Sequence, residues 1–210
     1  MYKRQIKNSI ESLIHNQYGE LIHYDSVATF TDGVTQEDVN TLEDDLSADG
    51  HIDDFLLNCG YSDDVKSSED TETAEYVIVD DKNAFKDYVT LRTRRKHNDV
   101  ILGDSGVVIT EKLSKDLGVK KGDKITVTSS PGKHAEAVVS GITEMYVNHY
   151  VYISTEYYNE LFGNIPEHNR VLIKISGDVN ETESYMGDEY LSRDYIKGVS
   201  FLNANVTRFE

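Results

Sequence analysis

The sequence has almost no cysteine and no long apolar run. Cys59 is the single cysteine among 210 residues, so an internal disulfide and a zinc site built on several cysteines are both excluded. The longest stretch without Asp, Glu, Lys or Arg runs from Met145 to Thr155, far short of the ~20 apolar residues that a membrane-spanning helix requires. Residues 2–5 are polar and no apolar segment follows them, which does not fit a signal peptide. We therefore expect a soluble domain, either free-standing or cut from a membrane protein.

Basic residues are also scarce. Lys and Arg number 21 against 38 Asp and Glu, which gives a formal net charge of −17. Such a charge argues against nucleic acid as a partner and against general adhesion to an anionic membrane. One segment reverses the pattern, with Arg92, Arg94, Arg95 and Lys96 close together. These residues are interpreted either as a solvated segment paired with neighbouring acids or as a contact for a partner or for membrane headgroups.

The stretch from Gly106 to Val127, GVVITEKLSKDLGVKKGDKITV, raises the question of a nucleotide site. A phosphate-binding loop places its glycines between a strand and the start of a helix. Here the order is reversed, because Gly118 follows a predicted helix and Gly122 precedes a predicted strand. We therefore predict a structural turn at Gly118, Gly122 and Asp123 that leads into a small β-barrel, with glycine supplying a positive φ and Asp123 bonding nearby backbone.

Other candidate sites are weak in the sequence. The seven histidines form no HExxH motif, and His149 is interpreted as a packed strand residue. No GxSxG motif occurs, and Cys59 is expected to be a buried thiol. An EF-hand beginning near Asp45 fails because Leu56 stands where the bidentate glutamate belongs. A looser calcium site remains an alternative to a helix end and turn, and its candidates are Asp44, Asp45, Asp49, Asp53 and Asp54.

Tyrosine is abundant, with 14 residues, and tryptophan is absent. The densest group comprises Tyr146, Tyr150, Tyr152, Tyr157 and Tyr158. Most of these side chains are expected in the core or on a strand face with a hydrated hydroxyl, and a few are candidates for a binding patch. Because no constellation of residue types stands out, the sequence assigns no catalytic, cofactor-binding or metal-binding residue and predicts no cofactor.

The apolar spacing predicts a β-α-β pattern at both ends of the chain and a β-rich segment between them. Thr35 and Asp38 predict a capping box at the start of a helix, and Val34 with Val39 predicts a hydrophobic staple. The first expected elements are a helix over 2–18, a strand over 20–30, the helix from Thr35 to Gly50, and strands over 52–58 and 75–79 joined by a polar hairpin or mobile loop. The middle of the chain is expected to form a short helix or turn over 83–88, a helix over 110–117, strands over 124–128, 135–142 and 149–153, and a helix that Ser154 caps and Gly163 ends. A strand over 170–176, a weaker helix over 180–191 and a strand over 198–206 are expected to follow.

Two segments together carry a family resemblance. They are LRTRRKHNDVILGDSGVVITEKLSKDLGVKKGDKITV and, after it, VSGITEMYVNHYVYISTEYYNELFG. Read together, they resemble the extracytoplasmic domain of FtsX/MacB-like ABC transporter permeases of the Gram-positive type. The match covers about residues 85–163. The resemblance implies an α+β fold with a porter-like module made from both chain ends, residues 19–81 and 169–210. It also implies a β-rich insert over residues 82–168, similar to the segment called Sabre in MacB, and a juxtamembrane stalk helix over residues 1–18.

The resemblance further implies a non-enzymatic ectodomain on the extracellular side of the cell membrane. It would couple ATP hydrolysis by a cytoplasmic ABC ATPase subunit to movement outside the membrane, for export, for lipid or peptide extraction or for activation of a partner. A second permease copy, an extracellular accessory protein and a peptide or lipid substrate are the further partners it implies. Two alternatives remain: a receptor module that binds a peptide or antibiotic through the tyrosine-rich insert, and an enzyme whose site is dispersed in the sequence.

Overall fold

The chain forms two compact units. The computed structural model describes residues 16–130 and 132–202. Unit 1 combines residues up to Asn58 with those from His168 onward, and unit 2 is the continuous segment Cys59–Glu167. Most of the helix expected over residues 2–18 lies outside the described residues. Within them, Gln17–Leu21 forms a short π-helix, η1.

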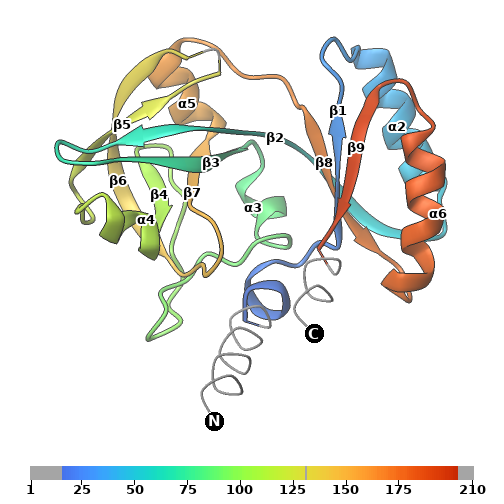
Figure 1. The fold of residues 1–210 in the computed structure, drawn as a ribbon, viewed down its shortest axis with the longest axis horizontal. Coiled ribbons are helices and arrows are strands. Elements are labelled where there is room, and N and C mark those ends of the chain that lie inside the picture. The colour runs from blue at the N-terminus through green and yellow to red at the C-terminus, as the bar shows by residue number, and fades with distance from the viewer. Residues whose placement is uncertain (1–15, 131, 203–210) are drawn as a thin grey trace. The chain divides into compact units, whose positions relative to one another are not determined.

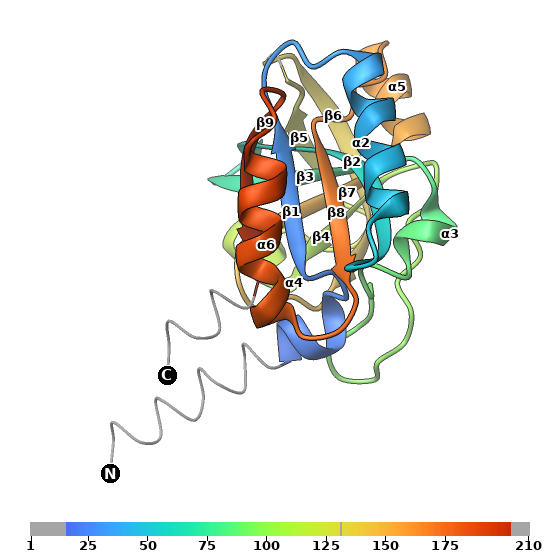
Figure 2. The ribbon, with the colours of Figure 1, turned by 90° about the vertical axis from the view of Figure 1, so that its right-hand side faces the viewer.

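Unit 1 is an antiparallel sheet with two helices packed on it (Figure 2). Its strands lie in the order β2–β8–β1–β9, so the two β-α-β segments from the two chain ends interleave as in a split β-α-β fold. Its elements are β1 (Ser26–Phe30), α2 (Gln36–Ala48), the first part of β2 (Ile52–Lys66), β8 (Arg170–Ile175), α6 (Val179–Leu191) and β9 (Ile196–Phe201). The helices bury apolar side chains against one face of the sheet, and these include Leu42 and Leu46 of α2 with Met186 and Tyr190 of α6.

Helix α2 begins as the sequence predicts. The backbone N–H of Asp38 donates to Thr35 Oγ1 at 3.2 Å, and the backbone N–H of Thr35 donates to Asp38 Oδ2 at 2.9 Å. These two bonds complete the capping box and use N–H groups that have no partner within the helix. The C-terminal end differs from the expectation, because Asp49 is the C-cap and Gly50 does not take a positive φ.

Unit 2 is a small barrel of six strands (Figure 1). Its strands neighbour one another in the order β2–β3–β7–β4–β6–β5, and β5 returns to β2 through the pair Lys66 and Thr126. The elements after β2 are β3 (Thr71–Val79), α3 (Lys82–Phe85), β4 (Val107–Thr110), α4 (Glu111–Asp116), β5 (Lys124–Thr128), β6 (His134–Thr143), β7 (Tyr150–Ser154) and α5 (Thr155–Phe162). Ser154 caps α5 by accepting from the N–H of Tyr157, and Gly163 ends it at φ +75°, both as expected.

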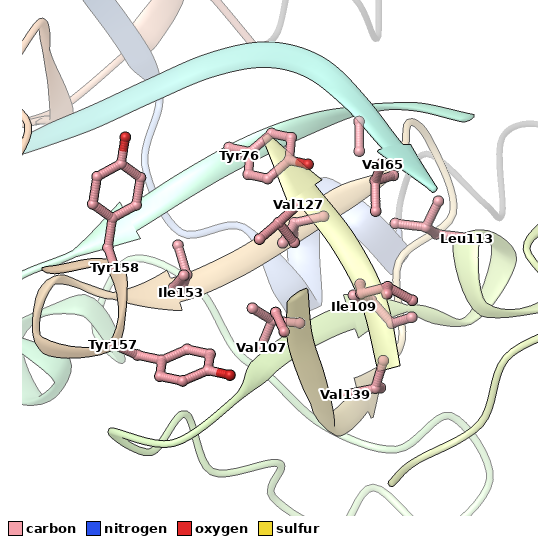
Figure 3. Close-up of a cluster of buried hydrophobic side chains, with 14 of the residues drawn as sticks. Val65, Tyr76, Val107, Ile109, Leu113, Val127, Val139, Ile153, Tyr157 and Tyr158 are labelled. Carbon is pink, nitrogen blue, oxygen red and sulfur yellow. The ribbon is translucent and has the colours of Figure 1, made fainter. Parts of the chain in front are cut away.

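The barrel interior holds an apolar core (Figure 3), and this core contains more buried residues than the unit 1 core within the described ranges. Strand side chains alternate, so every second residue of β5 and β6 points inward while its neighbours face outward. The inward group includes Val107, Ile109, Val127, Val139 and Ile153, which are almost completely buried. Leu113 of α4 and Tyr158 of α5 bring the helices onto the same core.

The structure divides the chain at a different place from the boundary expected after residue 81. Strand β3 pairs antiparallel with the second part of β2 and parallel with β7, so it belongs to the barrel. The segment between the expected strands is itself strand, because β2 continues to Lys66 and a tight turn closed by Ser67 N donating to Asp70 O leads into β3. Of the two alternatives expected for this segment, a hairpin or a mobile loop, the structure forms the hairpin. The first strand of the chain is shorter than expected, because it starts at Ser26.

The predicted fold class is confirmed: an α+β chain in which a β-α-β module from both chain ends carries a β-rich insert. Strand β8 is covered on both faces, with Val171, Leu172 and Ile173 all buried. Among the described residues, no helix is both long enough and apolar enough to cross a bilayer.

Candidate functional site

The Lys120–Asp123 turn is structural. Gly122 takes φ +97°, and Asp123 Oδ2 accepts from the backbone N–H of Lys120 at 2.8 Å. Gly122 N donates to Val139 O at 2.8 Å, and Val139 N donates to Asp123 O at 2.9 Å, which fastens the turn to β6. The turn therefore delivers the chain into barrel strand β5, as the glycine and aspartate pattern predicted.

Two of the acidic residues at the C-terminal end of α2, Asp45 and Asp49, are engaged with other side chains. Asp49 accepts hydrogen bonds from the hydroxyls of Tyr190 at 2.8 Å and Tyr185 at 3.1 Å, and Asp45 pairs with Arg193. Burial alone would raise the pKa of Asp49, but bonds from the His51 backbone, Tyr190, the His51 ring and Tyr185 together hold its pKa below the usual value. Within the described ranges no group of three or more His, Cys, Asp or Glu side chains is arranged to hold a metal ion. These carboxylates join α2 to α6.

The tyrosine cluster is mostly internal. Tyr152, Tyr157 and Tyr158 are buried, and the Tyr157 hydroxyl accepts from the backbone N–H of Val138 at 3.3 Å. Tyr150 is half-buried and stacks on Tyr152, its neighbour on the same face of β7, at 5.7 Å between ring centroids. The expectation of core and strand-face residues is met by these four, and Tyr146 lies instead in the loop before β7.

His149 and Cys59 are packed residues. Cys59 is a buried thiol on β2, as expected. His149 Nε2 lies 3.3 Å from Lys112 Nζ and 3.5 Å from Asp116 Oδ2, and its carbonyl accepts from Glu75 N. Burial and the Lys112 charge lower the pKa of His149.

One hollow in unit 2 is lined mainly by apolar surface and follows the chain from α3 to Leu102; it is called here the apolar hollow. It encloses about 500 Å³, within the range of small-molecule pockets. Phe85, Val89, Val100 and Leu102 contribute to its lining, and Ile101 is 77% exposed there. Lys82 at its edge donates to Asp104 and to Glu156, and the bond to Asp104 is the main cause that raises the pKa of Lys82.

No motif in the sequence predicts this apolar hollow. The run Val100–Leu102 is apolar and sits among charged residues, so it resembles a short strand in the sequence. Its side chains form a lining only because the chain folds back here, with Val100 N donating to Leu91 O at 2.9 Å. In the sequence, only the apolar run Val100–Leu102 itself indicated that something is buried here.

The basic residues lie on a tight hairpin between α3 and β4, formed by residues 92–99 and called here the basic hairpin (Figure 1). Arg92 is largely buried, and its Nε donates to the buried Glu144 carboxylate at 2.8 Å. Arg94 lies 3.8 Å from Glu111 and 5.2 Å from the centre of the Tyr146 ring. The expected pairing with neighbouring acids therefore holds for Arg92 and Arg94, whereas Arg95 and Lys96 are exposed and have no acidic partner in the part of the chain that the structure describes.

A second hollow lies beside this hairpin. It encloses about 730 Å³ and is open to solvent, and its lining comprises Thr93, Arg94, Arg95, Lys96, Asn98, Glu111 and Lys115. Glu111 is its only carboxylate, and this group already faces Arg94 and Lys115. The hollow is therefore cationic in a chain whose formal charge is −17.

Comparison with known proteins finds similar proteins by structure alone, because no family model and no curated protein matches the chain. The periplasmic region of MacB from Actinobacillus actinomycetemcomitans is 13% identical, covers 94% of this chain and 97% of its own, and superposes with a TM-score of 0.49. The extracellular domain of the noncanonic ABC-type transporter YknZ from Gram-positive bacteria is 11% identical, with coverages of 85% and 98% and a TM-score of 0.46. A domain of a permease protein from Porphyromonas gingivalis is 11% identical, with coverages of 82% and 81% and a TM-score of 0.39.

The structural neighbours and the sequence resemblance name the same kind of domain. By their own descriptions, the first is the periplasmic region of MacB and the second is the extracellular domain of an ABC-type transporter. All three TM-scores lie below 0.5, so these proteins share the layout of the chain with low detailed similarity. Residue roles in this chain are therefore argued from its own contacts.

Proposed function

We propose that this chain is the extracytoplasmic domain of an ABC transporter permease, and that it moves outside the membrane when a cytoplasmic ATPase subunit turns over ATP. The observation that carries the proposal is the pair of sequence motifs over residues 85–163. The first motif forms β4, α4, the Lys120–Asp123 turn and β5, and the second forms part of β6, β7 and α5. Both are framework elements of the barrel, which supports a non-enzymatic role for them.

The connection of the barrel to unit 1 also supports a mechanical role. The chain leaves unit 1 at Asn58 and re-enters it at His168, and Asn169 N donates to Asn58 O at 3.1 Å. Both links to the barrel thus depart from neighbouring points of one hydrogen-bonded strand pair. We infer that a displacement of the β2–β8 pair is passed to the barrel through both links at once. Such a movement would serve one of three kinds of partner: a second permease copy, an external accessory protein, or a peptide or lipid substrate.

The test is to isolate the native gene product from cells and to identify what accompanies it. We expect it in the membrane fraction, cleaved by protease added to intact cells, and purified together with an ABC ATPase that hydrolyses ATP. Recovery from the cytosolic fraction without an ATPase would refute the proposal. A protease cleavage site can be introduced at either of two exposed positions in unit 2, Ser105 or Lys121. Testing both positions separately ensures that the result does not depend on the accessibility of a single loop.

A second candidate function is a ligand-binding module, and the apolar hollow at residues 82–102 favours it. The site then differs from the tyrosine patch expected from the sequence, because those tyrosines are mostly buried. A thermal-shift screen of peptides and antibiotics against the chain tests it. A true ligand should lose its effect in Ile101→Asp, which alters the hollow, and keep it in Ile165→Asp, where the side chain is 62% exposed outside the hollow. A screen without hits that meet both conditions would count against this function.

A further inference from the structure

The basic hairpin holds its cations on an ordered turn. Thr93 N donates to Asn98 O at 2.8 Å, His97 N donates to Thr93 O at 2.9 Å, and Asn98 N donates to Thr93 Oγ1 at 3.1 Å. His97 completes the turn with φ +51°. Arg92 anchors its base through the buried Glu144 carboxylate. The tip is therefore fixed, and binding there does not require ordering a loose segment.

The charge at this tip is not neutralised by the chain. Arg94 and Lys115 share the Glu111 carboxylate at 3.8 and 4.0 Å, which are long and exposed contacts. Arg95 and Lys96 extend into solvent with no acidic partner among the described residues. The hairpin and the adjoining hollow thus present a local positive field that an anion can enter.

Amphipathic and apolar side chains adjoin these cations. Arg94 lies over the ring of Tyr146, and the next residue, Val147, is 36% exposed. Tyrosine and small apolar side chains beside Lys and Arg are the combination that favours the headgroup region of a bilayer, where rings and chains meet hydrocarbon while cations meet phosphate. An acidic protein surface would use the cations but would gain little from an exposed valine at the same place.

We propose that the basic hairpin, with Tyr146 and Val147 beside it, binds the phosphate headgroups of an anionic phospholipid membrane. The rest of the chain is acidic and is repelled by the same surface, so the contact is confined to this hairpin. It is weak and sensitive to salt, because the Debye length falls from about 30 Å at 0.01 M to about 8 Å at 0.15 M ionic strength. The inference does not depend on the transporter function proposed above.

The test is co-sedimentation of the chain with vesicles of phosphatidylcholine, with and without phosphatidylglycerol, at about 0.01 M and about 0.15 M ionic strength. We expect binding to the vesicles that contain phosphatidylglycerol at the lower ionic strength and a marked loss at the higher. The double variant Arg95→Gln/Lys96→Gln should weaken this binding by about 30-fold, since each cation near an anionic surface contributes about 1 kcal/mol.

The matched control is Lys120→Gln/Lys121→Gln, which removes the same charge from an exposed pair on the same unit and should leave binding unchanged. Val147→Asp should weaken binding as well, because it removes the apolar contact and adds repulsion. Equal binding to neutral vesicles, equal loss in both double variants, or no binding at low ionic strength would each overturn the proposal. The proposal would also be overturned if the chain bound inorganic phosphate through Arg95 and Lys96 but did not bind the vesicles. A negative result leaves membrane fractionation and ATPase co-purification of the native gene product unaffected, so the two proposals fail separately.

Discussion

Unit 1 and unit 2 build their apolar cores from the chain in different ways. Unit 2 is one continuous segment whose strands return to their starting point, so its core is complete without any residue outside Cys59–Glu167. Unit 1 draws on two segments separated by that whole insert, and its sheet alternates strands from the two chain ends. We therefore expect the barrel to fold by itself, whereas unit 1 needs the barrel to bring Asn58 and Asn169 together.

The energetic consequence is a one-way dependence. If the barrel unfolds, roughly 110 residues become a flexible loop between β2 and β8. Relative to a loop of about four residues this is about five doublings in length, and each doubling costs about 0.6 kcal/mol, so unit 1 would lose about 3 kcal/mol. Unfolding of unit 1 imposes no such cost on the barrel.

The largest effects are expected from a matched pair of core truncations, Leu42→Ala in α2 and Leu113→Ala in α4. Both side chains are completely buried, so each change should lower the free energy of unfolding of its own unit by about 2–5 kcal/mol. Hydrogen exchange should show that Leu42→Ala weakens protection in unit 1 alone, and that Leu113→Ala weakens both units. The exposed α2 substitution Asp44→Ala is the control. Equal and symmetric losses in both variants would contradict the one-way dependence.

A somewhat smaller loss is expected from Gly106→Ala at the start of β4. Gly106 has φ +123°, and an added Cβ would lie 2.7 Å from Ser140 Cβ and 2.8 Å from the Val138 carbonyl oxygen. Strain and crowding together should destabilise the barrel by about 3 kcal/mol, measured by urea unfolding. Gly103→Ala is the control, since it has open space and no positive φ. Similar stability of the two variants would show that β4 is not held against β6 as tightly as described.

The next effect concerns unit 1 and depends on pH. Asp49→Asn should destabilise unit 1 by about 2 kcal/mol at pH 7, because its charged hydrogen bonds to Tyr190, Tyr185 and His51 become neutral ones. The folded-state pKa of Asp49 is lowered, so its stabilising contribution is present above the unfolded pKa of about 4 and is lost as the pH falls through the folded value.

Urea unfolding of the wild-type chain and of Asp49→Asn at a series of pH values measures this contribution. The difference in stability should shrink toward zero on acidification, and the exposed Asp44→Asn variant should show little difference at any pH. A difference in stability between the wild-type chain and Asp49→Asn that stays constant down to strongly acidic pH would mean that the charge of Asp49 is not what joins α2 to α6.

The smallest effect is expected at the capping box. Thr35→Ala removes the side-chain acceptor for the N–H of Asp38 and should lower the stability of unit 1 by about 1 kcal/mol. Ser47→Ala changes an exposed hydroxyl near the other end of the same helix and should be nearly neutral, so thermal unfolding of the two variants isolates the cap. An equal loss in both would assign the effect to general helix propensity.

Much of the fold could be predicted because local signals coincide with the final contacts. The Thr35 capping box, the Ser154 cap, the Gly163 end of α5 and the Lys120–Asp123 turn all depend on residues within a few positions of one another. The boundary between the units could not be predicted in this way. Strand β3 belongs to the barrel because it pairs with β7, and no residue near β3 specifies a partner so distant in the sequence.

The candidate surfaces were predictable to different degrees. The basic run was visible as a reversal of charge, but the pairing of Arg92 with Glu144 and the freedom of Arg95 depend on where the chain folds back. The apolar hollow is formed by residues from both sides of that hairpin, so its existence follows from the backbone pairing of Leu91 with Val100. The tyrosines were correctly expected to be mainly core residues.

The open sheet of unit 1 has an implication for aggregation. A barrel has no free strand edge, whereas the unit 1 sheet ends in the first part of β2 on one side and in β9 on the other, as far as the described residues extend. Unpaired edges invite strands from other molecules. The β2 edge carries Asp53 and Asp54 beside a break in register, and β9 contains Lys197 and Gly198. Such charges and irregularities discourage flat pairing between copies, so we expect concentrated solutions of the folded chain to stay free of β-sheet aggregates.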